Sequence, residues 1–351
     1  MDSADMPTDA DDKRKTQFNK LMEALLSEKP SKFNRFSIYR ASYPSANFDI
    51  GVDIIVPKSK KSSSPRPVIV RIHGGFLITG SSLFPAWFTN WILDYAELHD
   101  AIIISPNYRL LPEVKGLDIL KDVENFWLWF KNGGAQKHLH SVERLDVQLN
   151  VDRLMVLGES AGGYLALQSA LCRFAEPRAL ILAYPMLDFE SAHYTQRMDK
   201  PIVGVPNFPD KLVDDFLRNS NTTEAITEID PPARLDLAMA IVQNGRFVDV
   251  FGTEPILFPL KNLAKVGTSM TLPPLFILHG EQDSAVPVEG SRKFVEELKL
   301  QSPSSKVHLI IRPGDHGFDN EATLAELWLA DGLRSVTEAW LNRLSFYNSA
   351  L

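Results

Sequence analysis

The sequence has little of what disulfide-linked, membrane-spanning or nucleic-acid-binding proteins require. Cys172 is the one cysteine among 351 residues, so no intramolecular disulfide can form. No run of about 18 apolar residues occurs, and the polar, acidic start lacks the apolar segment of a signal peptide. The net charge of -7 provides no attraction to nucleic acid or to anionic membranes. We therefore expect a cytoplasmic protein with no nucleic-acid partner and no membrane span.

Signals for a cofactor or a metal ion are equally scarce. The sequence has no glycine-rich phosphate loop and no dinucleotide-binding fingerprint. His138 and His140 resemble a metal pair only superficially, because the pair alone does not make a zinc-site pattern. We expect no cofactor and no metal, and a small-molecule substrate as the partner. The oligomeric state is left open, with a homodimer as one alternative.

What the sequence does contain is a series of short, nearly continuous apolar runs. They lie at 68–72, 101–105, 153–157, 179–183, 275–278 and 307–311. Such runs are typical of strands in a parallel sheet that helices cover on both faces. Between them, apolar residues recur at spacings of three and four, as in the stretch from Leu117 to Phe130. The alternation predicts a doubly wound α/β fold, preceded by two further strands at 36–42 and 48–56.

Two regions depart from this alternation. Residues 1–16 are polar and are predicted to be disordered, whereas 18–26 has the apolar spacing of an amphipathic helix. Residues 188–272 are rich in proline and phenylalanine and lack a strong strand run, which indicates an insertion that lines a pocket. The alternative is an irregular connection whose aromatic residues anchor it to the core. The predicted division is 1–45 for the disordered start and N-terminal cap contribution, 46–187 and 273–351 for the core, and 188–272 for the cap.

A candidate nucleophile follows the run at 153–157. Gly158-Glu159-Ser160-Ala161-Gly162 lies between that predicted strand and an apolar helical stretch. G-x-S-x-G is the pattern of a sharp strand-to-helix turn that projects a serine hydroxyl above the sheet. The pattern alone is weak evidence, but its position between a strand and a helix makes a chance match much less plausible. Ser160 is therefore the predicted nucleophile.

A serine hydroxyl needs a base and an orienting acid, which in this kind of fold follow later strands in the order acid, then histidine. The run at 275–278 leads to Asp283, and the run at 307–311 leads to His316. These two residues complete the predicted triad. Glu281, two residues before Asp283, is the rival acid.

Donors for a developing oxyanion are predicted after the first apolar run. His73-Gly74-Gly75-Phe76 follows the run at 68–72, and its glycines allow a close approach of the backbone. The predicted donors are the N–H groups of Gly75, Phe76 and Ala161. His73, Gly74 and Glu159 are expected to support the site. The alternative for Gly74 and Gly75 is a plain turn.

The motifs together resemble one family, the hormone-sensitive-lipase-like branch of the α/β-hydrolases, or alpha/beta hydrolase fold-3 carboxylesterases. The matching segments are H-G-G-F at 73–76, N-Y-R-L-L-P-E at 107–113, G-E-S-A-G-G at 158–163, Y-P-M-L-D at 184–188, G-E-Q-D at 280–283 and D-H-G-F at 315–318. The resemblance implies an α/β-hydrolase fold: a mostly parallel central sheet flanked by helices, with a helical cap built from the N-terminal region and an insertion.

The resemblance also implies a serine esterase that cleaves a carboxylic ester of a small, largely apolar molecule. Two residues depart from the family pattern: Phe76 stands where a third glycine is usual, and Glu159 where aspartate is frequent. Phe76 leaves the substrate size open. The alternative is a biosynthetic tailoring enzyme that cyclises, dehydrates or releases a metabolite, with His316 as its base. A non-catalytic receptor on this scaffold is disfavoured because no triad member is missing.

Overall fold

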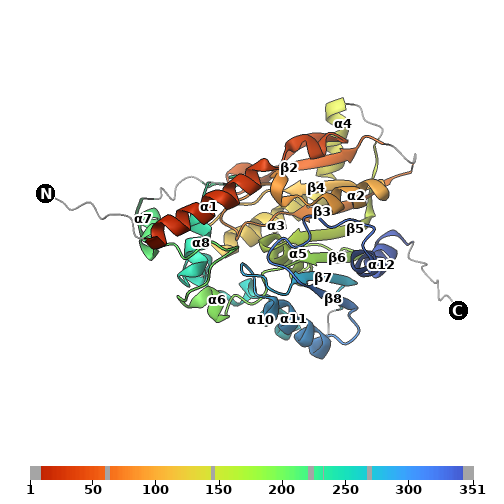
Figure 1. Cartoon of the computed structure of the whole chain (residues 1–351). Helices are drawn as coiled ribbons and strands as arrows, with labels where there is room; N and C mark the ends of the chain where they lie inside the picture. Colours follow the sequence, from red (N-terminus) through yellow and green to blue (C-terminus); the bar gives the residue numbers. More distant parts are fainter. Residues whose placement is uncertain are drawn as a thin grey trace.

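An eight-stranded sheet runs through the protein, with helices on both faces (Figure 1). The computed structural model describes residues 9–59, 64–143, 147–219, 225–231, 233–266 and 271–342. The strands are β1 (Phe36–Ser45), β2 (Phe48–Pro57), β3 (Arg66–Ile72), β4 (Ile102–Pro106), β5 (Leu149–Glu159), β6 (Ala179–Ala183), β7 (Leu275–Gly280) and β8 (Val307–Arg312). Each predicted strand is thus confirmed, with shifts of a few residues at the ends.

The strand order is β1-β2-β4-β3-β5-β6-β7-β8. The β1–β2 and β2–β4 pairs are antiparallel, and every later pair is parallel. Because β3, β5, β7 and β8 all run the same way, the loops after them meet at one edge of the sheet. The predicted mostly parallel α/β sheet is confirmed.

The core has two layers, one on each face of the sheet. Neighbouring strand residues alternate between them: Val68 and Val70 pack in one apolar cluster, and Ile69 packs in the other. The first face is covered by α3 (Gly116–Lys131), α5 (Ala161–Leu171) and α11 (Val288–Gln301), and the second by α2 (Asn90–Leu98) and α12 (Leu327–Leu341). Because helices cover both faces of the sheet, the central strands are buried and apolar.

The start of the described chain is helical. Helix α1 spans Asp9–Ser27, so the predicted disorder of 1–16 is wrong from Asp9 onward, while the helix predicted at 18–26 is confirmed. Three acidic residues in the first turn favour a helix start, because negative charge is stabilised there. Arg14 also donates to the Asn207 carbonyl oxygen at 3.0 Å, which fixes this turn to the rest of the protein. Residues 1–8 lie outside the described part of the chain.

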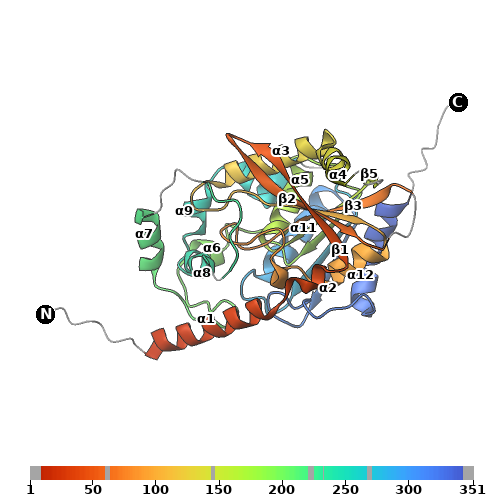
Figure 2. The ribbon, with the colours of Figure 1, turned by 90° about the horizontal axis from the view of Figure 1, so that it is seen from above.

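The segment between β6 and β7 is mainly helical. It contains α6 (Ala192–Thr195), α7 (Asp210–Asn219), α8 (Leu235–Gln243), α9 (Phe247–Phe251) and α10 (Pro259–Val266). Helix α1 runs beside it in both ribbon views (Figure 2), and the Phe18 and Phe208 rings pack at 5.5 Å. Backbone hydrogen bonds between Gly80 and Ile229 tie this segment to the loop after β3. The division at 188–272 into a separate cap stays a prediction.

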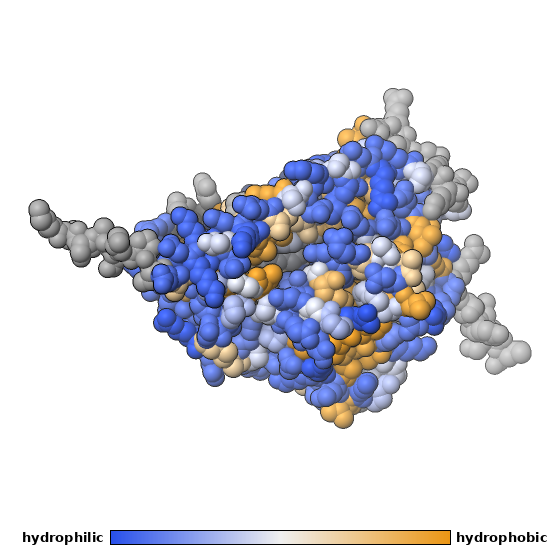
Figure 3. Space-filling model, viewed as in Figure 1, coloured by the Kyte–Doolittle hydropathy of each residue, from blue (hydrophilic) through white to orange (hydrophobic). Residues whose placement is uncertain are grey.

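The remaining elements lie in the connections between the strands and helices described above. They are α4 (Gly134–Glu143) and short 3-10 helices at Pro30–Phe33, Pro85–Trp87 and Pro255–Leu257. The face in Figure 3 is mainly hydrophilic, with hydrophobic residues in separate patches. Among the helices of the described residues, none has the length and hydrophobicity to cross a membrane.

Candidate active site

Ser160 lies in the sharp turn between β5 and α5. Its backbone has φ 55° and ψ -119°, a conformation that residues other than glycine rarely adopt. A Cβ atom on Gly158 would lie 2.1 Å from the carbonyl oxygen of Gly162, and one on Gly162 would lie 1.9 Å from that of Ile72. The turn therefore requires both glycines of the predicted motif, because backbone atoms occupy the space of a side chain.

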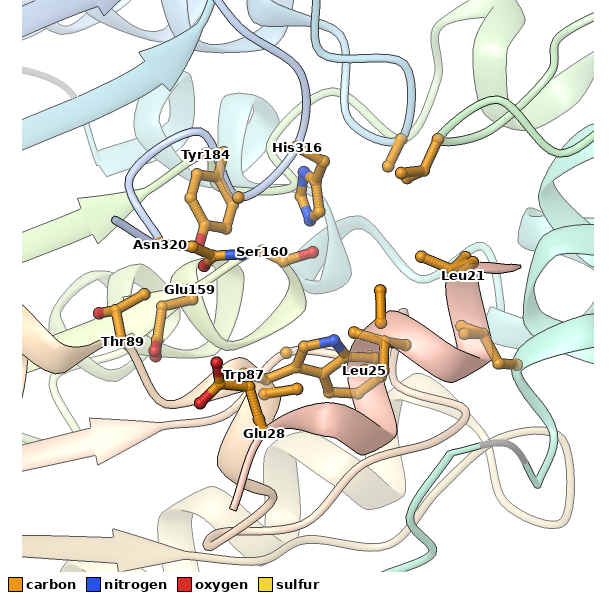
Figure 4. Close-up of a pocket in the computed structure, with 18 of the residues that line it drawn as sticks. Leu21, Leu25, Glu28, Trp87, Thr89, Glu159, Ser160, Tyr184, His316 and Asn320 are labelled. Atoms are coloured by element: carbon orange, nitrogen blue, oxygen red, sulfur yellow. The ribbon is translucent and has the colours of Figure 1, made fainter. Parts of the chain in front are cut away.

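His316 comes from the loop after β8 and turns its imidazole toward the Ser160 hydroxyl (Figure 4). Its Nδ1 lies 2.8 Å from Oδ2 of Asp283, which follows β7. The loop is held by Asp315, whose Oδ1 accepts the backbone N–H of Ser284 at 2.7 Å. The structure thus brings together the three residues of the predicted triad, from segments far apart in the sequence.

The Asp283 carboxylate is buried and surrounded by donors. Its Oδ1 accepts the N–H groups of Ala285 at 3.0 Å and Val286 at 2.8 Å, and its Oδ2 lies 3.3 Å from Nε2 of His279. Burial alone raises the pKa of Asp283, but the charge of His316 and hydrogen bonds from His279 and His316 together lower it. Asp283 is therefore an anion at neutral pH.

The same contact acts in the opposite direction on His316. Burial lowers the pKa of His316, but the charge of Asp283 and the hydrogen bond to it outweigh burial, and the pKa is raised above 6.5. Glu281, the rival acid, is exposed, and its carboxylate lies 4.0 Å from Arg292. Asp283, not Glu281, is the partner of the imidazole.

The loop after β3 has an unusual backbone. Gly75, Phe76 and Leu77 have φ values of 110°, 56° and 63°, and a Cβ on Gly75 would lie 1.9 Å from the Thr79 carbonyl oxygen. Among the hydrogen bonds of the described residues, none uses the N–H groups of Gly75, Phe76 or Ala161. The predicted donors therefore have no competing acceptor within the described part of the chain. The Phe76 side chain is buried in the wall of the cavity beside Ser160.

His73 and Gly74 support this loop. The imidazole of His73 stacks on Tyr108 at 4.5 Å, and its Nδ1 lies 2.8 Å from the Gly74 carbonyl oxygen. Burial lowers the pKa of His73 to about 3, so the ring is neutral. A Cβ on Gly74 would lie 2.9 Å from the backbone carbonyl oxygen of Glu159 and 3.1 Å from Cβ of Ser160, which explains why a residue without a side chain is needed there. His73 is thus held by stacking on Tyr108 and by a hydrogen bond to the loop, and Gly74 leaves room for Ser160.

Glu159 forms a buried ion pair with Arg71 beneath the turn. Nε and Nη2 of Arg71 lie 3.1 and 2.9 Å from Oε1 of Glu159, and its guanidinium covers the Phe88 ring at 4.0 Å. Arg71 also donates to the carbonyl oxygens of Ser82 at 3.0 Å and Trp87 at 2.5 Å. Burial raises the pKa of Glu159 to about 7, although the Arg71 charge opposes the rise. The pair fixes the residue before Ser160 to the loop that carries Trp87.

Replacing Arg71 by methionine is expected to lower the free energy of unfolding by about 1–3 kcal/mol, because the buried Glu159 carboxyl group then lacks its hydrogen-bonding partner. Urea unfolding near neutral pH measures the change. The matched double variant, Arg71→Met with Glu159→Leu, removes both charges and is expected to recover most of the loss. An undiminished loss in the double variant would show that packing of Arg71, not its charge, stabilises the site.

A cavity of about 410 Å³ opens beside Ser160. Its walls come from α1, with Leu21 and Leu25, from the loop around Trp87, from α8, with Met239, and from the loop of His316. Figure 4 shows these elements around the serine hydroxyl. A concave, partly apolar space next to an activated side chain is the usual form of a small-molecule site.

Known proteins share this architecture. The sequence profile described as alpha/beta hydrolase fold matches residues 69–240. A probable carboxylesterase of Phoma sp. is 32% identical over 299 residues, which are 82% of this chain and 91% of that protein. The chain belongs to the alpha/beta hydrolase fold-3 family. The resemblance predicted from the motifs is thereby confirmed.

A second relative and a solved structure are also similar to this chain. A probable carboxylesterase of Cochliobolus lunatus is 30% identical over 210 residues, which are 57% of this chain and 92% of that protein. The solved structure of a Pyrobaculum calidifontis esterase superposes with a TM-score of 0.56 at 19% sequence identity. The match covers 97% of this chain and 94% of the esterase. At that identity, the likeness concerns the fold alone.

Sequence reasoning missed several residues around the site. His279 directly follows the apolar run of β7, and Arg71 interrupts the apolar run of β3. A charged or titratable residue within a buried apolar run needs a buried partner. His279 and Arg71 could therefore have been identified from the sequence. Thr89 and Asn320 line the cavity but carry no sequence signal, because only the folding of distant loops brings them there.

Proposed function

We propose that this chain is a serine carboxylic ester hydrolase that acts through an acyl-enzyme on Ser160. One observation carries the proposal: His316 contacts Asp283 through Nδ1 at 2.8 Å while its ring is turned to the Ser160 hydroxyl. A base held between a serine and a buried carboxylate is the arrangement that makes the hydroxyl nucleophilic. The carboxylesterase names of the relatives support the same activity.

The reaction proceeds in two acyl transfers. Oγ of Ser160 attacks the ester carbonyl carbon while Nε2 of His316 takes the hydroxyl proton, and Asp283 stabilises the resulting imidazolium. Collapse of the tetrahedral intermediate expels the alcohol, which receives that proton from His316. Water then attacks the acyl-enzyme with His316 again as base. The products are the carboxylic acid and free Ser160.

The developing oxyanion is assigned to the N–H groups of Gly75, Phe76 and Ala161. The support is that these N–H groups have no acceptor among the described residues and that the Ala161 N–H stands at the amino end of α5, where negative charge is stabilised. Each such donor contributes about 3 kcal/mol to stabilisation of the transition state. His73, Gly74 and Glu159 position this machinery.

We assign a cap role to the N-terminal region and to residues 188–272. Support comes from the cavity wall, to which α1 contributes Leu21 and Leu25 and α8 contributes Leu235 and Met239. An apolar wall of this kind favours a small, largely apolar substrate. The cytoplasmic location and the assembly state stay predictions from the sequence.

A fluorophosphonate probe tests the proposal, because it phosphonylates a serine only when a base activates it. We expect stoichiometric labelling of the native protein, with Ser160 as the labelled residue in peptide mapping, and parallel loss of p-nitrophenyl ester hydrolysis. Heat-denatured protein serves as the control and should stay unlabelled. Folded protein that is neither labelled nor active on short and medium esters would favour the biosynthetic alternative with His316 as base.

The pH dependence of kcat/KM reports on His316. Only the neutral imidazole can accept the Ser160 proton, and the pKa of this group is raised above 6.5. We therefore expect kcat/KM for a p-nitrophenyl ester to rise with pH through a midpoint above 6.5. Initial rates at constant ionic strength give the profile. A flat profile between about pH 5 and pH 9 would mean that no such base titrates.

A further inference from the structure

A tight turn in the segment between β6 and β7 forms part of the cavity wall. Ile202 and Val205 exchange backbone hydrogen bonds at 3.1 and 2.9 Å. Between them, Val203 and Gly204 have φ values of 48° and 75°. Ile202 and Val203 line the cavity beside Ser160. A β-branched residue such as Val203 rarely adopts a positive φ, so contacts outside the turn must hold it there.

The hydroxyl group of Ser284 makes such a contact. Its Oγ accepts the backbone N–H of Val203 at 2.8 Å. Ser284 directly follows Asp283, whose carboxylate accepts the N–H groups of the next two residues after the serine at 3.0 and 2.8 Å. The serine side chain therefore stands on a fixed piece of backbone, and it joins the cavity wall to the loop after β7.

A second contact reinforces this junction. Nε2 of His193, in α6, lies 3.0 Å from the carbonyl oxygen of Ala285. Burial lowers the pKa of His193 to about 4, so the ring is neutral and its Nε2 donates the hydrogen bond. The segment between β6 and β7 thus meets the loop after β7 at two consecutive residues, Ser284 and Ala285.

The Ser284 hydroxyl group also reaches the loop after β8. Its Oγ lies 2.8 and 3.0 Å from the two carboxylate oxygens of Asp315. A serine hydroxyl has one proton to donate and two lone pairs that accept, so it donates to Asp315 while it accepts from Val203. Oδ1 of Asp315 in turn accepts the backbone N–H of His316 at 2.7 Å. An unbroken line of hydrogen bonds therefore runs from the cavity wall to the backbone of His316.

Two consecutive residues of the loop after β7 thus hold the predicted base at two points. Asp283 contacts the ring of His316 through Nδ1 at 2.8 Å, and Ser284 restrains its backbone through Asp315. With both contacts in place, the imidazole stays directed at the Ser160 hydroxyl. The restraint matters because a displacement of about 1 Å in a catalytic geometry costs about 100-fold in rate.

We propose that Ser284 is a positioning residue for the predicted base. Its hydroxyl group fixes the backbone of His316 through Asp315, and it ties the strained turn at Val203 to the same loop. The inference rests on the proposed esterase mechanism. It adds a residue that lies outside the cavity lining and acts on the reaction through His316.

Ser284→Ala tests the proposal, because it removes the hydroxyl group and keeps the backbone of the loop. We expect kcat to fall by about 10- to 100-fold for both p-nitrophenyl acetate and p-nitrophenyl hexanoate, since both reactions use His316. KM should stay within about twofold, because acylation and deacylation slow together. Fluorophosphonate labelling should slow by a similar factor and still reach a stoichiometric end point. An unchanged kcat, or a loss confined to KM for the hexanoate, would overturn the proposal.

Two further variants separate the hydrogen bonds from the bulk of the side chain. Ser284→Thr retains a hydroxyl group and should recover kcat to within about threefold of the native protein. Ser305→Ala is the matched control: the half-buried Ser305 likewise accepts a backbone N–H, from Leu272 at 2.9 Å, but lies outside the cavity lining. It should keep the native kcat and KM. A loss in Ser284→Thr or in Ser305→Ala as large as that in Ser284→Ala would contradict positioning by the Ser284 hydroxyl.

A double-mutant cycle shows whether Ser284 acts through Asp315. Asp315→Ala removes the link between the serine and the His316 backbone, and it should lower kcat at least as much as Ser284→Ala does. Adding Ser284→Ala should then cost less than about threefold, because residues of one hydrogen-bond network are not additive. Full multiplication of the two losses would mean that Ser284 acts independently of Asp315, contrary to the proposal. Should Ser284→Ala fail to fold by circular dichroism, a reduced kcat in folded Asp315→Ala would support the line of hydrogen bonds and an unchanged one would overturn it.

Failure of this inference is distinct from failure of the proposed function. If the native protein is neither labelled at Ser160 nor active on either ester, the esterase proposal itself fails. If the native protein is labelled and active but Ser284→Ala matches it in kcat, only the positioning role of Ser284 fails.

Discussion

Replacing Ser160 by alanine is expected to lower kcat for a p-nitrophenyl ester by about 10⁶-fold, the loss found when a serine nucleophile is removed from a complete triad. The reason is that no other hydroxyl occupies the turn between β5 and α5 in the described chain. Residual hydrolysis would then come from binding and from the oxyanion donors alone. Initial rates at saturating substrate, with active-site titration of the parent protein, measure the change.

Ser191→Ala is the matched control for this substitution. Ser191 stands just before α6, outside the cavity lining, and its backbone carbonyl oxygen, which a change of side chain retains, accepts the hydrogen bonds there. We expect its kcat to equal that of the parent protein. A loss of only about tenfold in Ser160→Ala would mean that the hydroxyl merely positions the substrate, and the reaction would then have no acyl-enzyme.

Much of the fold could be predicted because its signals are local. The apolar runs of β3, β7 and the second half of β5 are buried on both faces, so nearly every residue in them had to be apolar, whereas β8, at the edge of the sheet, is only partly buried. The glycines around Ser160 are fixed by backbone contacts under 3 Å for any added Cβ. The strand β5, the turn at Ser160 and the helix α5 could therefore be predicted from the sequence.

What could not be predicted depends on contacts between distant segments. The first half of α1 has a polar sequence, which led to the prediction of disorder. It is held in place by the hydrogen bond from Arg14 to the carbonyl oxygen of Asn207, in the segment before α7. The available signal was the acidic first turn, Asp9, Asp11 and Asp12, which favours a helix start. Thr89 belongs to no motif, and its place in the cavity follows only from the packing of α2.

Packing explains why Phe76 can stand where the family pattern has a glycine. A positive φ of 56° usually favours glycine, which is the residue that the family pattern has there. In this chain the strained conformation is retained, and the ring is buried in the apolar core with Leu77 and Ile78. Packing of the ring offsets the backbone strain, and the Phe76 N–H has no acceptor among the described residues. Phe76 is thus part of the cavity wall, and the predicted N–H donor is retained.

Replacing Asp283 by asparagine is expected to lower kcat by about 10⁴-fold, with little change in KM. An asparagine oxygen can still accept the N–H groups of Ala285 and Val286, so the loop should fold. Its amide group, however, would face Nδ1 of His316 and favour the tautomer with the proton on Nε2, which cannot accept the Ser160 proton. Steady-state kinetics on a p-nitrophenyl ester, with circular dichroism as the folding check, provide the measurement.

The pH profile separates this electrostatic role from a purely structural one. Because the Asp283 charge is what raises the pKa of His316 above 6.5, the asparagine variant should shift the midpoint of kcat/KM to lower pH. Glu281→Gln removes the neighbouring exposed carboxylate, 4.0 Å from Arg292, and should leave both kcat and the midpoint unchanged. The reverse result, with the large loss and the shifted midpoint in Glu281→Gln, would make Glu281 the acid and would break the relay from Asp283 through His316 to Ser160.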